Sequence, residues 1–227
     1  MALDTKRKVI PINEHVFIPG RTGSGKTYLA RKYLANYKNV VALDTKGLLS
    51  WPEIPGTVWT GPEKENLKNN GKNENLTIVT KLSEIDTVET PKIIYRPPWE
   101  ELKDEYYNEF FKWIYLRRNT IVWVDEVMSI CPSPYKIPEY YKAILTRGRQ
   151  RNTAVWSLTQ RPSGIPQITM SESTHFFCFD LNLPQDREKL VEVTGARELL
   201  QKPGKYLFWY YHVAHDEAYK AKLVERR

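Results

Sequence analysis

The sequence predicts an α/β fold in which a mostly parallel central sheet carries helices on both faces. Short runs of apolar and β-branched residues alternate with longer amphipathic stretches, which is the pattern of βα units around a parallel sheet. Several of these runs are apolar almost throughout, as strands covered on both faces are. No internal repeat or Gly/Ser/Pro-rich linker divides the 227 residues. We therefore expect one domain over residues 1–227, with residues 1–13 as an N-terminal extension and the charged, asparagine-rich segment 61–75 as a mobile loop.

The strands of this sheet are expected where apolar runs are bounded by turn residues. Five such runs occupy residues 15–19, 39–44, 120–125, 153–159 and 174–180. Two more segments near the C-terminus, residues 205–211 and 217–224, are expected to form antiparallel strands that close the sheet.

Three stretches between these strands place apolar residues at helical spacing. They are residues 26–37, 99–118 and 138–147. The last of them begins with Pro138 and stops before Gly148, which are typical start and stop residues of a helix.

Composition and charge exclude several classes of protein. The chain is 41% hydrophobic and 12% aromatic, unlike a disordered protein. No apolar run approaches the roughly 20 residues that cross a bilayer, so we expect no membrane association. The two cysteines, Cys131 and Cys178, have neither metal-binding nor redox spacing, and the polar N-terminus is no signal peptide; together they indicate the cytoplasm. The net charge of +7 permits a polyanionic partner without requiring one.

A glycine-rich loop carries the strongest chemical signal. The residues Gly20-Arg21-Thr22-Gly23-Ser24-Gly25-Lys26-Thr27 match G-x-x-x-x-G-K-[ST], directly after an expected strand and at the start of an expected helix. Glycines let the backbone curl so that successive N–H groups and the helix N-terminus face a phosphate. Lys26 would reach the β- and γ-phosphates of ATP, and the Thr27 hydroxyl would bind Mg²⁺. The expected nucleotide-binding set runs from Gly20 to Tyr28.

Two adjacent carboxylates at the end of a buried strand form the second signal. Asp125 would hold Mg²⁺ through water, and Glu126 would polarise the attacking water as a general base. A strand that ends in two solvated acids is common in isolation, but the phosphate loop favours the functional interpretation. Glu126 also favours an ATPase over a simple nucleotide kinase, because a kinase needs no base for water.

The strand at residues 153–159 is flanked by two further candidates. Gln160 follows it and would face the γ-phosphate if this strand lies beside the phosphate-loop strand; the alternative is an ordinary amide at a strand end. Arg147, Arg149 and Arg151 precede it in a turn. They could offer an arginine finger to the ATP of a neighbouring subunit, contact nucleic-acid phosphates, or form a solvated basic turn.

Two features near the C-terminus are expected to be structural. His212 and His215 would point to opposite faces of a strand, which disfavours a shared metal ion. The aromatic run Trp209-Tyr210-Tyr211 could stack on bases, but core packing is the simpler interpretation.

These motifs, in this order, resemble the FtsK–HerA superfamily of DNA-pumping ATPases. The run VVALDTKG at residues 40–47 looks like the superfamily's second strand, which typically ends in Asp-Pro-Lys-Gly; here Thr45 replaces the proline. Residues 148–149 and 154–162 are similar to its sensor strand with the preceding arginine. That register places Arg149 on the family arginine, with Arg147 as a nearby substitute. The resemblance covers most of residues 14–195.

The resemblance implies a viral genome-packaging ATPase, because other branches carry spanning segments or domains that this chain is too short to hold. It implies a homo-oligomeric ring, a pentamer or hexamer, with ATP and Mg²⁺ at each interface and Glu126, Lys26, Gln160 and Arg149 or Arg147 as catalytic groups. It also implies backbone contacts to double-stranded DNA and a portal or capsid vertex as partner. A plasmid or bacterial DNA translocase, a phage assembly or export ATPase, a P-loop small-molecule kinase and a non-hydrolysing ATP-binding module remain alternatives.

Overall fold

One ten-stranded sheet organises the described part of the chain. The computed structural model describes residues 9–54, 57–59 and 75–222. The strands are β1 (Val16–Pro19), β2 (Val40–Leu43), β3 (Thr57–Trp59), β4 (Leu76–Val79), β5 (Lys92–Tyr95), β6 (Ile121–Val124), β7 (Ala154–Thr159), β8 (His175–Cys178), β9 (Phe208–His212) and β10 (Tyr219–Ala221). Their order in the sheet is β10-β9-β8-β1-β7-β6-β2-β5-β4-β3. The pairs from β8 to β3 are parallel, whereas β9 runs antiparallel to both β8 and β10.

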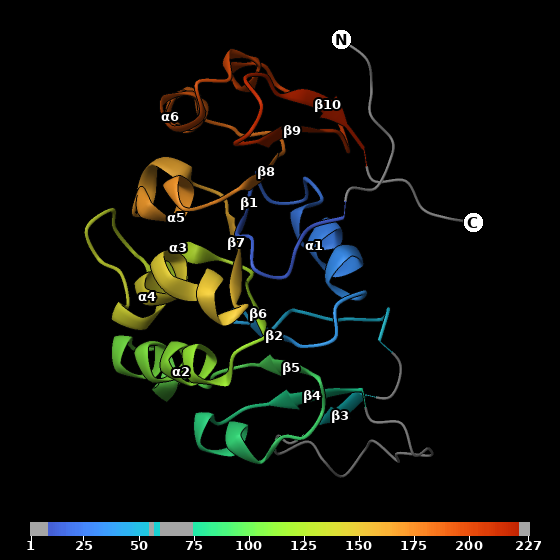
Figure 1. The fold of residues 1–227 in the computed structure, drawn as a ribbon, viewed down its shortest axis with the longest axis vertical. Coiled ribbons are helices and arrows are strands. Elements are labelled where there is room, and N and C mark those ends of the chain that lie inside the picture. Colours follow the sequence, from blue (N-terminus) through green and yellow to red (C-terminus); the bar gives the residue numbers. More distant parts are fainter. Residues whose placement is uncertain (1–8, 55–56, 60–74, 223–227) are drawn as a thin grey trace.

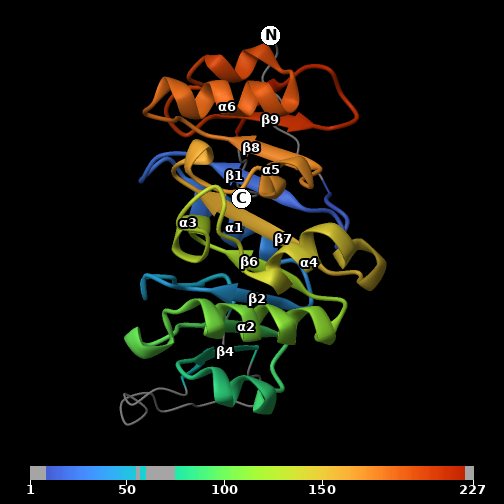
Figure 2. The same cartoon turned by 90° about the vertical axis from the view of Figure 1, so that its left-hand side faces the viewer.

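Helices cover both faces of this sheet. The α-helices are α1 (Lys26–Leu34), α2 (Asp104–Arg117), α3 (Val127–Ile130), α4 (Glu139–Arg147), α5 (Ile168–Ser171) and α6 (Pro184–Thr194). Short 3-10 helices are η2 (Leu82–Thr87), η3 (Trp99–Glu101), η4 (Gly148–Arg151), η5 (Pro162–Gly164) and η6 (Arg197–Leu200). Helix α1 lies on one face, and α2 to α5 lie on the other, as Figure 1 shows. Figure 2 views the second group in front of the strands.

Successive strand residues point alternately into two hydrophobic clusters, one on each face of the sheet. Val122 of β6 and Val155 of β7 pack with α2 and α4, while their neighbours Trp123 and Trp156 pack on the α1 face. All four side chains are fully buried. Burial on both faces explains why these strands read as continuous apolar runs.

The fold class expected from the sequence is confirmed, and so are the five predicted strands, which the structure shortens by a residue or two at their ends. The predicted C-terminal pair is β9 and β10, antiparallel at one edge of the sheet. The sequence missed β3, β4 and β5, which extend the opposite edge, and it missed α3, α5 and α6. The predicted loop 61–75 lies, apart from residue 75, outside the described residues.

One predicted helix, residues 99–118, was wrong in its first turn. Residues 99–101 form the separate 3-10 helix η3, and Leu102 leaves the helical region with ψ 57°. The Glu101 carboxylate accepts hydrogen bonds from the Leu82 N–H, at 2.9 Å, and the Tyr95 hydroxyl, at 2.5 Å. These bonds tie the turn to the sheet edge, so α2 begins only at Asp104.

The N-terminal segment joins the core before β1 begins. Ile10 is buried in the α1 cluster, and its carbonyl accepts a hydrogen bond from the Tyr37 hydroxyl at 2.7 Å. Within the described ranges, no helix combines the length and apolar character that a bilayer crossing requires.

Candidate functional site

The glycine-rich loop connects β1 to α1 and curls tightly at its glycines. Gly25 precedes the helix with φ 108°, a conformation that side chains disfavour. At Gly20 the constraint is space, because an added Cβ would lie 2.6 Å from the Phe179 Cβ and 2.7 Å from the Ser24 Oγ. Ser24 Oγ is itself buried without a hydrogen-bond partner. The loop therefore has the close backbone approach that a phosphate cradle requires.

Lys26, the first residue of α1, lies across this loop. Its side chain is buried, and its Nζ donates to the Arg21 carbonyl oxygen at 3.1 Å. Burial lowers the pKa of Lys26 to about 8, although the carboxylates of Glu126 and Asp125 oppose this shift. A buried ammonium held by one carbonyl is a favourable partner for an anion, because phosphate oxygens would replace the solvation that burial has removed.

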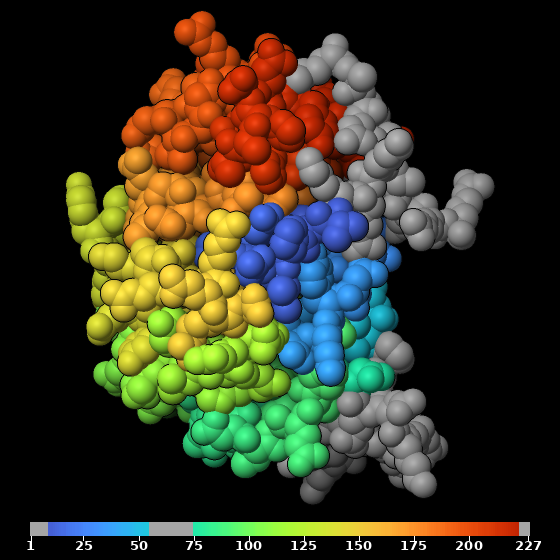
Figure 3. Space-filling view, in the orientation of Figure 1, coloured from blue at the N-terminus to red at the C-terminus, as the bar shows by residue number. Residues whose placement is uncertain are grey.

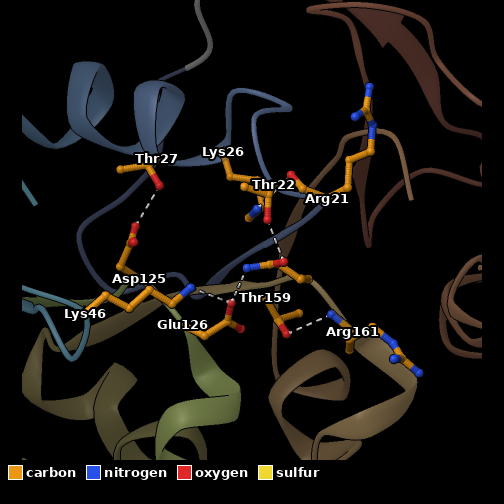
Figure 4. Close-up of polar contacts among 10 residues, drawn as sticks. Arg21, Thr22, Lys26, Thr27, Lys46, Asp125, Glu126, Thr159 and Arg161 are labelled. Carbon is orange, nitrogen blue, oxygen red and sulfur yellow. Dashed lines mark hydrogen bonds and ion pairs between the residues drawn. The ribbon is translucent and has the colours of Figure 1, made fainter. Parts of the chain in front are cut away.

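Oxygen ligands converge where α1 faces the end of β6. The Thr27 Oγ1 donates to the Asp125 Oδ1 at 2.9 Å, a contact drawn in Figure 4. Burial raises the pKa of Asp125, and the Thr27 hydrogen bond partly offsets that effect. A hydroxyl and a carboxylate side by side are the ligand types that Mg²⁺ takes in nucleotide sites, so the residues present fit this ion.

Glu126 lies at the centre of a continuous polar chain. Its Oε2 accepts hydrogen bonds from the Lys46 Nζ at 3.1 Å and the Gln160 Nε2 at 3.0 Å. The Gln160 Oε1 in turn accepts from the Thr22 Oγ1 of the phosphate loop at 2.8 Å. The second carboxylate oxygen, Oε1, is buried without a partner. The arrangement links the phosphate loop to the predicted general base through one amide.

Sheet order explains why residues so far apart in sequence meet here. The carboxyl ends of neighbouring parallel strands lie at one edge of a sheet, and β1, β7, β6 and β2 are consecutive neighbours. Gln160 follows β7, which pairs directly with β1, as the sequence-based hypothesis required. Asp125 and Glu126 follow β6, and Lys46 follows β2.

Lys46 is a site residue that the sequence motif contained but to which we assigned no role. The buried Asp44 organises the turn that presents it. The Asp44 carboxylate accepts from the backbone N–H groups of Leu48 and Leu49 and from the Arg96 Nε at 2.9 Å. A strand end that reads Asp-x-Lys-Gly beside the phosphate loop was the available signal.

Two residues of the predicted nucleotide-binding set turn away from the polar chain. Arg21 pairs through its Nε with Asp180 Oδ2 at 3.0 Å and points away from Glu126 in Figure 4. Tyr28 lies on the exposed side of α1, where Arg31 and Lys32 flank its ring at 5.2 and 5.5 Å. Their roles in nucleotide binding stay predictions.

The three arginines lie at the amino end of β7, whereas Gln160 and the phosphate loop lie at the carboxyl ends of their strands. Arg147 ends α4, and Arg149 and Arg151 belong to η4, which precedes β7. About 20 Å of strand separates them from Gln160, so none reaches the phosphate loop of its own chain. Arg151 is committed elsewhere, because its Nε donates to the Tyr115 carbonyl at 2.7 Å and its guanidinium stacks on the Tyr115 ring. Arg147 and Arg149 are exposed.

The chain is similar to viral proteins both in sequence and in fold. The DNA packaging ATPase P9 of Enterobacteria phage PRD1 is 25% identical over 196 residues, which cover 84% of this chain and 75% of that protein. The genome packaging NTPase B204 of Sulfolobus turreted icosahedral virus 2, in complex with AMPPCP, superposes with a TM-score of 0.71. It is 16% identical, with 94% of this chain and 100% of that chain covered. The chain has the fold of the viral genome-packaging NTPases.

The packaging-NTPase fold recurs in a second structure and, less closely, in a conjugation protein. B204 from Sulfolobus turreted icosahedral virus matches with a TM-score of 0.69 at 19% identity, over 95% of this chain and all of that chain. The pCW3 conjugation coupling protein TcpA matches with a TM-score of 0.56 at 15% identity, over 93% of this chain and 60% of that chain. No family model matches the sequence.

Proposed function

We propose that this chain is the ATP-hydrolysing subunit of a motor that packages double-stranded viral DNA. The observation that carries the proposal is the polar chain from Thr22 through Gln160 to Glu126. It couples a phosphate-binding loop to a carboxylate positioned to activate water, which is the requirement of an ATPase. The packaging role rests on the names and folds of the similar proteins from phage PRD1 and the Sulfolobus viruses.

In the proposed site, each residue has a distinct task. The phosphate loop and Lys26 bind the β- and γ-phosphates, with the Lys26 ammonium exchanging its carbonyl partner for phosphate oxygens. Thr27 and, through water, Asp125 would hold Mg²⁺, which neutralises charge on the phosphates when it is bound. Glu126 accepts a proton from the attacking water through its carboxylate.

Gln160 acts as the sensor of the γ-phosphate. Its Oε1 now accepts from the Thr22 hydroxyl, and its Nε2 donates to Glu126. A γ-phosphate near the loop competes for Thr22, so nucleotide occupancy changes the hydrogen bonding of the base. Lys46 donates to the same carboxylate oxygen, Oε2. If the Lys46 ammonium moved away, this oxygen could accept a proton from water.

The proposed assembly is a homo-oligomeric ring, a pentamer or hexamer, that works in the host cytoplasm at a portal or capsid vertex. Arg147 and Arg149 are exposed and too far from their own phosphate loop, which supports their acting on the ATP of the next subunit. Contacts to DNA would be mostly to phosphates and therefore independent of sequence and sensitive to salt.

A conjugative or plasmid DNA translocase is the second candidate, because the coupling protein TcpA shares the fold at a TM-score of 0.56. A small-molecule kinase is the less favoured alternative, because the similar proteins from phage PRD1 and Sulfolobus turreted icosahedral virus 2 are named as packaging proteins.

Translocation on DNA is the direct test. The full chain is incubated with Mg-ATP and a linear duplex that carries a third strand bound in the major groove. Displacement of the third strand that requires ATP hydrolysis, and fails with the Lys26→Ala variant, supports the motor. ATP turnover without displacement on any duplex would contradict it and favour an enzyme that does not move along DNA.

A further inference from the structure

Three side chains with metal-binding atoms meet at the other end of β1. Glu14 precedes β1, His175 begins β8, and His212 ends β9. One potential ligand atom from each lies within 4.8 Å of those of the other two. Figure 3 shows the blue N-terminal part of the chain beside its orange and red C-terminal part, the two parts that supply these residues. The length of β1, about 13 Å, separates the cluster from the phosphate loop.

The hydrogen bonds around His175 are those of an oriented ligand. Its Nε2 lies 2.6 Å from the Glu14 Oε2, and its Nδ1 lies 2.7 Å from the Tyr210 hydroxyl. His175 is 2% exposed, so its ring has little freedom to turn. Metal-binding histidines commonly use one ring nitrogen for the ion and fix the ring with a hydrogen bond from the other. Tyr210 supplies that second contact.

The donor set selects the class of ion. Two imidazoles and one carboxylate are ligands that Zn²⁺ accepts, with the remaining tetrahedral position open to water. Mg²⁺ and Ca²⁺ prefer oxygen ligands throughout, so this cluster differs in kind from the Thr27 and Asp125 pair.

We propose that Glu14, His175 and His212 form a binding site for a transition-metal dication of the Zn²⁺ class. The site is separate from the nucleotide site and does not depend on the proposed function. Ligand distances of about 2.1 Å place tetrahedral ligand atoms about 3.4 Å apart. The His175 Nε2 and the Glu14 Oε2, now 2.6 Å apart, would have to separate, and all three ligand atoms already lie within 4.8 Å of one another.

His212 has to exchange one local contact for the metal. Its Nδ1 now accepts a hydrogen bond from the Ala214 N–H at 3.1 Å. Binding through either ring nitrogen of the neutral imidazole ends that acceptor role, so the turn after β9 adjusts. The expected separation of His212 and His215 onto opposite faces was wrong, because β9 ends at His212 and the two rings lie 5.4 Å apart. His215 is exposed and adjoins the site without belonging to the set of three.

A bound ion would connect three parts of the chain to one another. Glu14 belongs to the segment before β1, His175 to the last parallel strand, and His212 to the antiparallel edge. The expected consequence is stabilisation of the C-terminal edge against local opening, since a ligand that binds only the folded state stabilises it by mass action.

The test is a calorimetric titration of the full chain, stripped with chelator, with Zn²⁺ in the presence of excess Mg²⁺, which fills oxygen-ligand sites. We expect one Zn²⁺ per chain and a rise in the thermal midpoint of about 5–10 °C at a free Zn²⁺ concentration near 100 times its Kd. Co²⁺ used as the probe should give the visible absorption of a four- or five-coordinate site with nitrogen and oxygen ligands.

Three variants assign the ligands. His212→Ala should abolish Zn²⁺ uptake, and the nearly isosteric Glu14→Gln should weaken it at least about tenfold while the fold is kept. His215→Ala is the matched control and should bind as the wild type does. Absence of Zn²⁺ uptake by the wild type, or uptake that Glu14→Gln and His212→Ala leave unchanged, would overturn the proposal. Zn²⁺ uptake lost in His215→Ala but kept in His212→Ala would overturn the ligand assignment.

Discussion

Replacement of Glu126 by glutamine separates the proposed role of this residue as a base from its role in the structure. Glu126 is 6% exposed, and one oxygen of its carboxylate receives hydrogen bonds from Lys46 and Gln160. An amide in the same position keeps the shape and one acceptor oxygen but loses the negative charge. The perturbation therefore removes proton acceptance with the smallest steric change that the site allows.

The magnitudes follow from these contacts. Loss of a general base lowers turnover by about 100- to 10,000-fold. The two hydrogen bonds become neutral-acceptor bonds, and because Lys46 is partly exposed, the free energy of unfolding should fall by only about 1 kcal/mol. For a chain of this size that corresponds to about 2–4 °C in Tm. Affinity for ATP should change little, since Lys26 and the phosphate loop are untouched.

The assay compares phosphate release, binding of a fluorescent ATP analogue and thermal unfolding in three proteins: wild type, Glu126→Gln and Glu100→Gln. Glu100 lies exposed in η3 and serves as the matched control. Turnover of Glu126→Gln within about tenfold of the wild type, with Glu100→Gln unchanged, would refute the assignment of the base.

Three further substitutions test the proposed sensor Gln160, the arginine proposed to reach the next subunit's ATP, Arg149, and the turn before β7, which contains Gly148. Gln160→Ala removes the link between the phosphate loop and the base, and should lower turnover by about 10- to 100-fold with ATP affinity kept, as phosphate release and analogue binding would measure. Arg149→Ala should lower turnover but not affinity, and mixing it with Lys26→Ala protein should restore activity, because the Lys26 variant supplies an intact arginine to the Arg149 variant's site. Gly148→Ala would place a Cβ 2.4 Å from the Thr153 carbonyl oxygen, and calorimetry should record destabilisation of about 1–3 kcal/mol.

Each of these expectations has a contradicting outcome. Full activity of Gln160→Ala would show that the amide is only a strand-end side chain. No recovery at any mixing ratio, in rings shown by native mass measurement to contain both variants, would remove Arg149 from the neighbour's site. A Tm of Gly148→Ala equal to that of the wild type would mean that the turn before β7 shifts without cost.

The phosphate loop and the two carboxylates could be predicted because the residues of each motif are contiguous in the sequence. Gly20 to Thr27 and the pair Asp125-Glu126 each form a local motif at a strand end. The central strands could be predicted as well, since strands that are buried on both faces, such as β6, are apolar at every position. These features depend on neighbours along the chain, which sequence patterns record directly.

The missed features depend on tertiary contacts. The β4 sequence Leu-Thr-Ile-Val has a polar residue inside it, and its neighbour β5 begins with Lys92, so both lack the uninterrupted apolar run that marks β6. Lys46 becomes a site residue only when β2 is placed beside β6, and the cluster of His175 with Glu14 requires β8 to lie beside β1. Strand order, not local pattern, decides these contacts.

The most direct test of a ring motor is the steady-state ATPase rate per subunit, measured against protein concentration with and without double-stranded DNA. Sites completed by a neighbour's arginine predict a rate per subunit that rises with concentration and rises further with DNA. A rate that is flat with concentration and indifferent to DNA would contradict both the shared site and the packaging role.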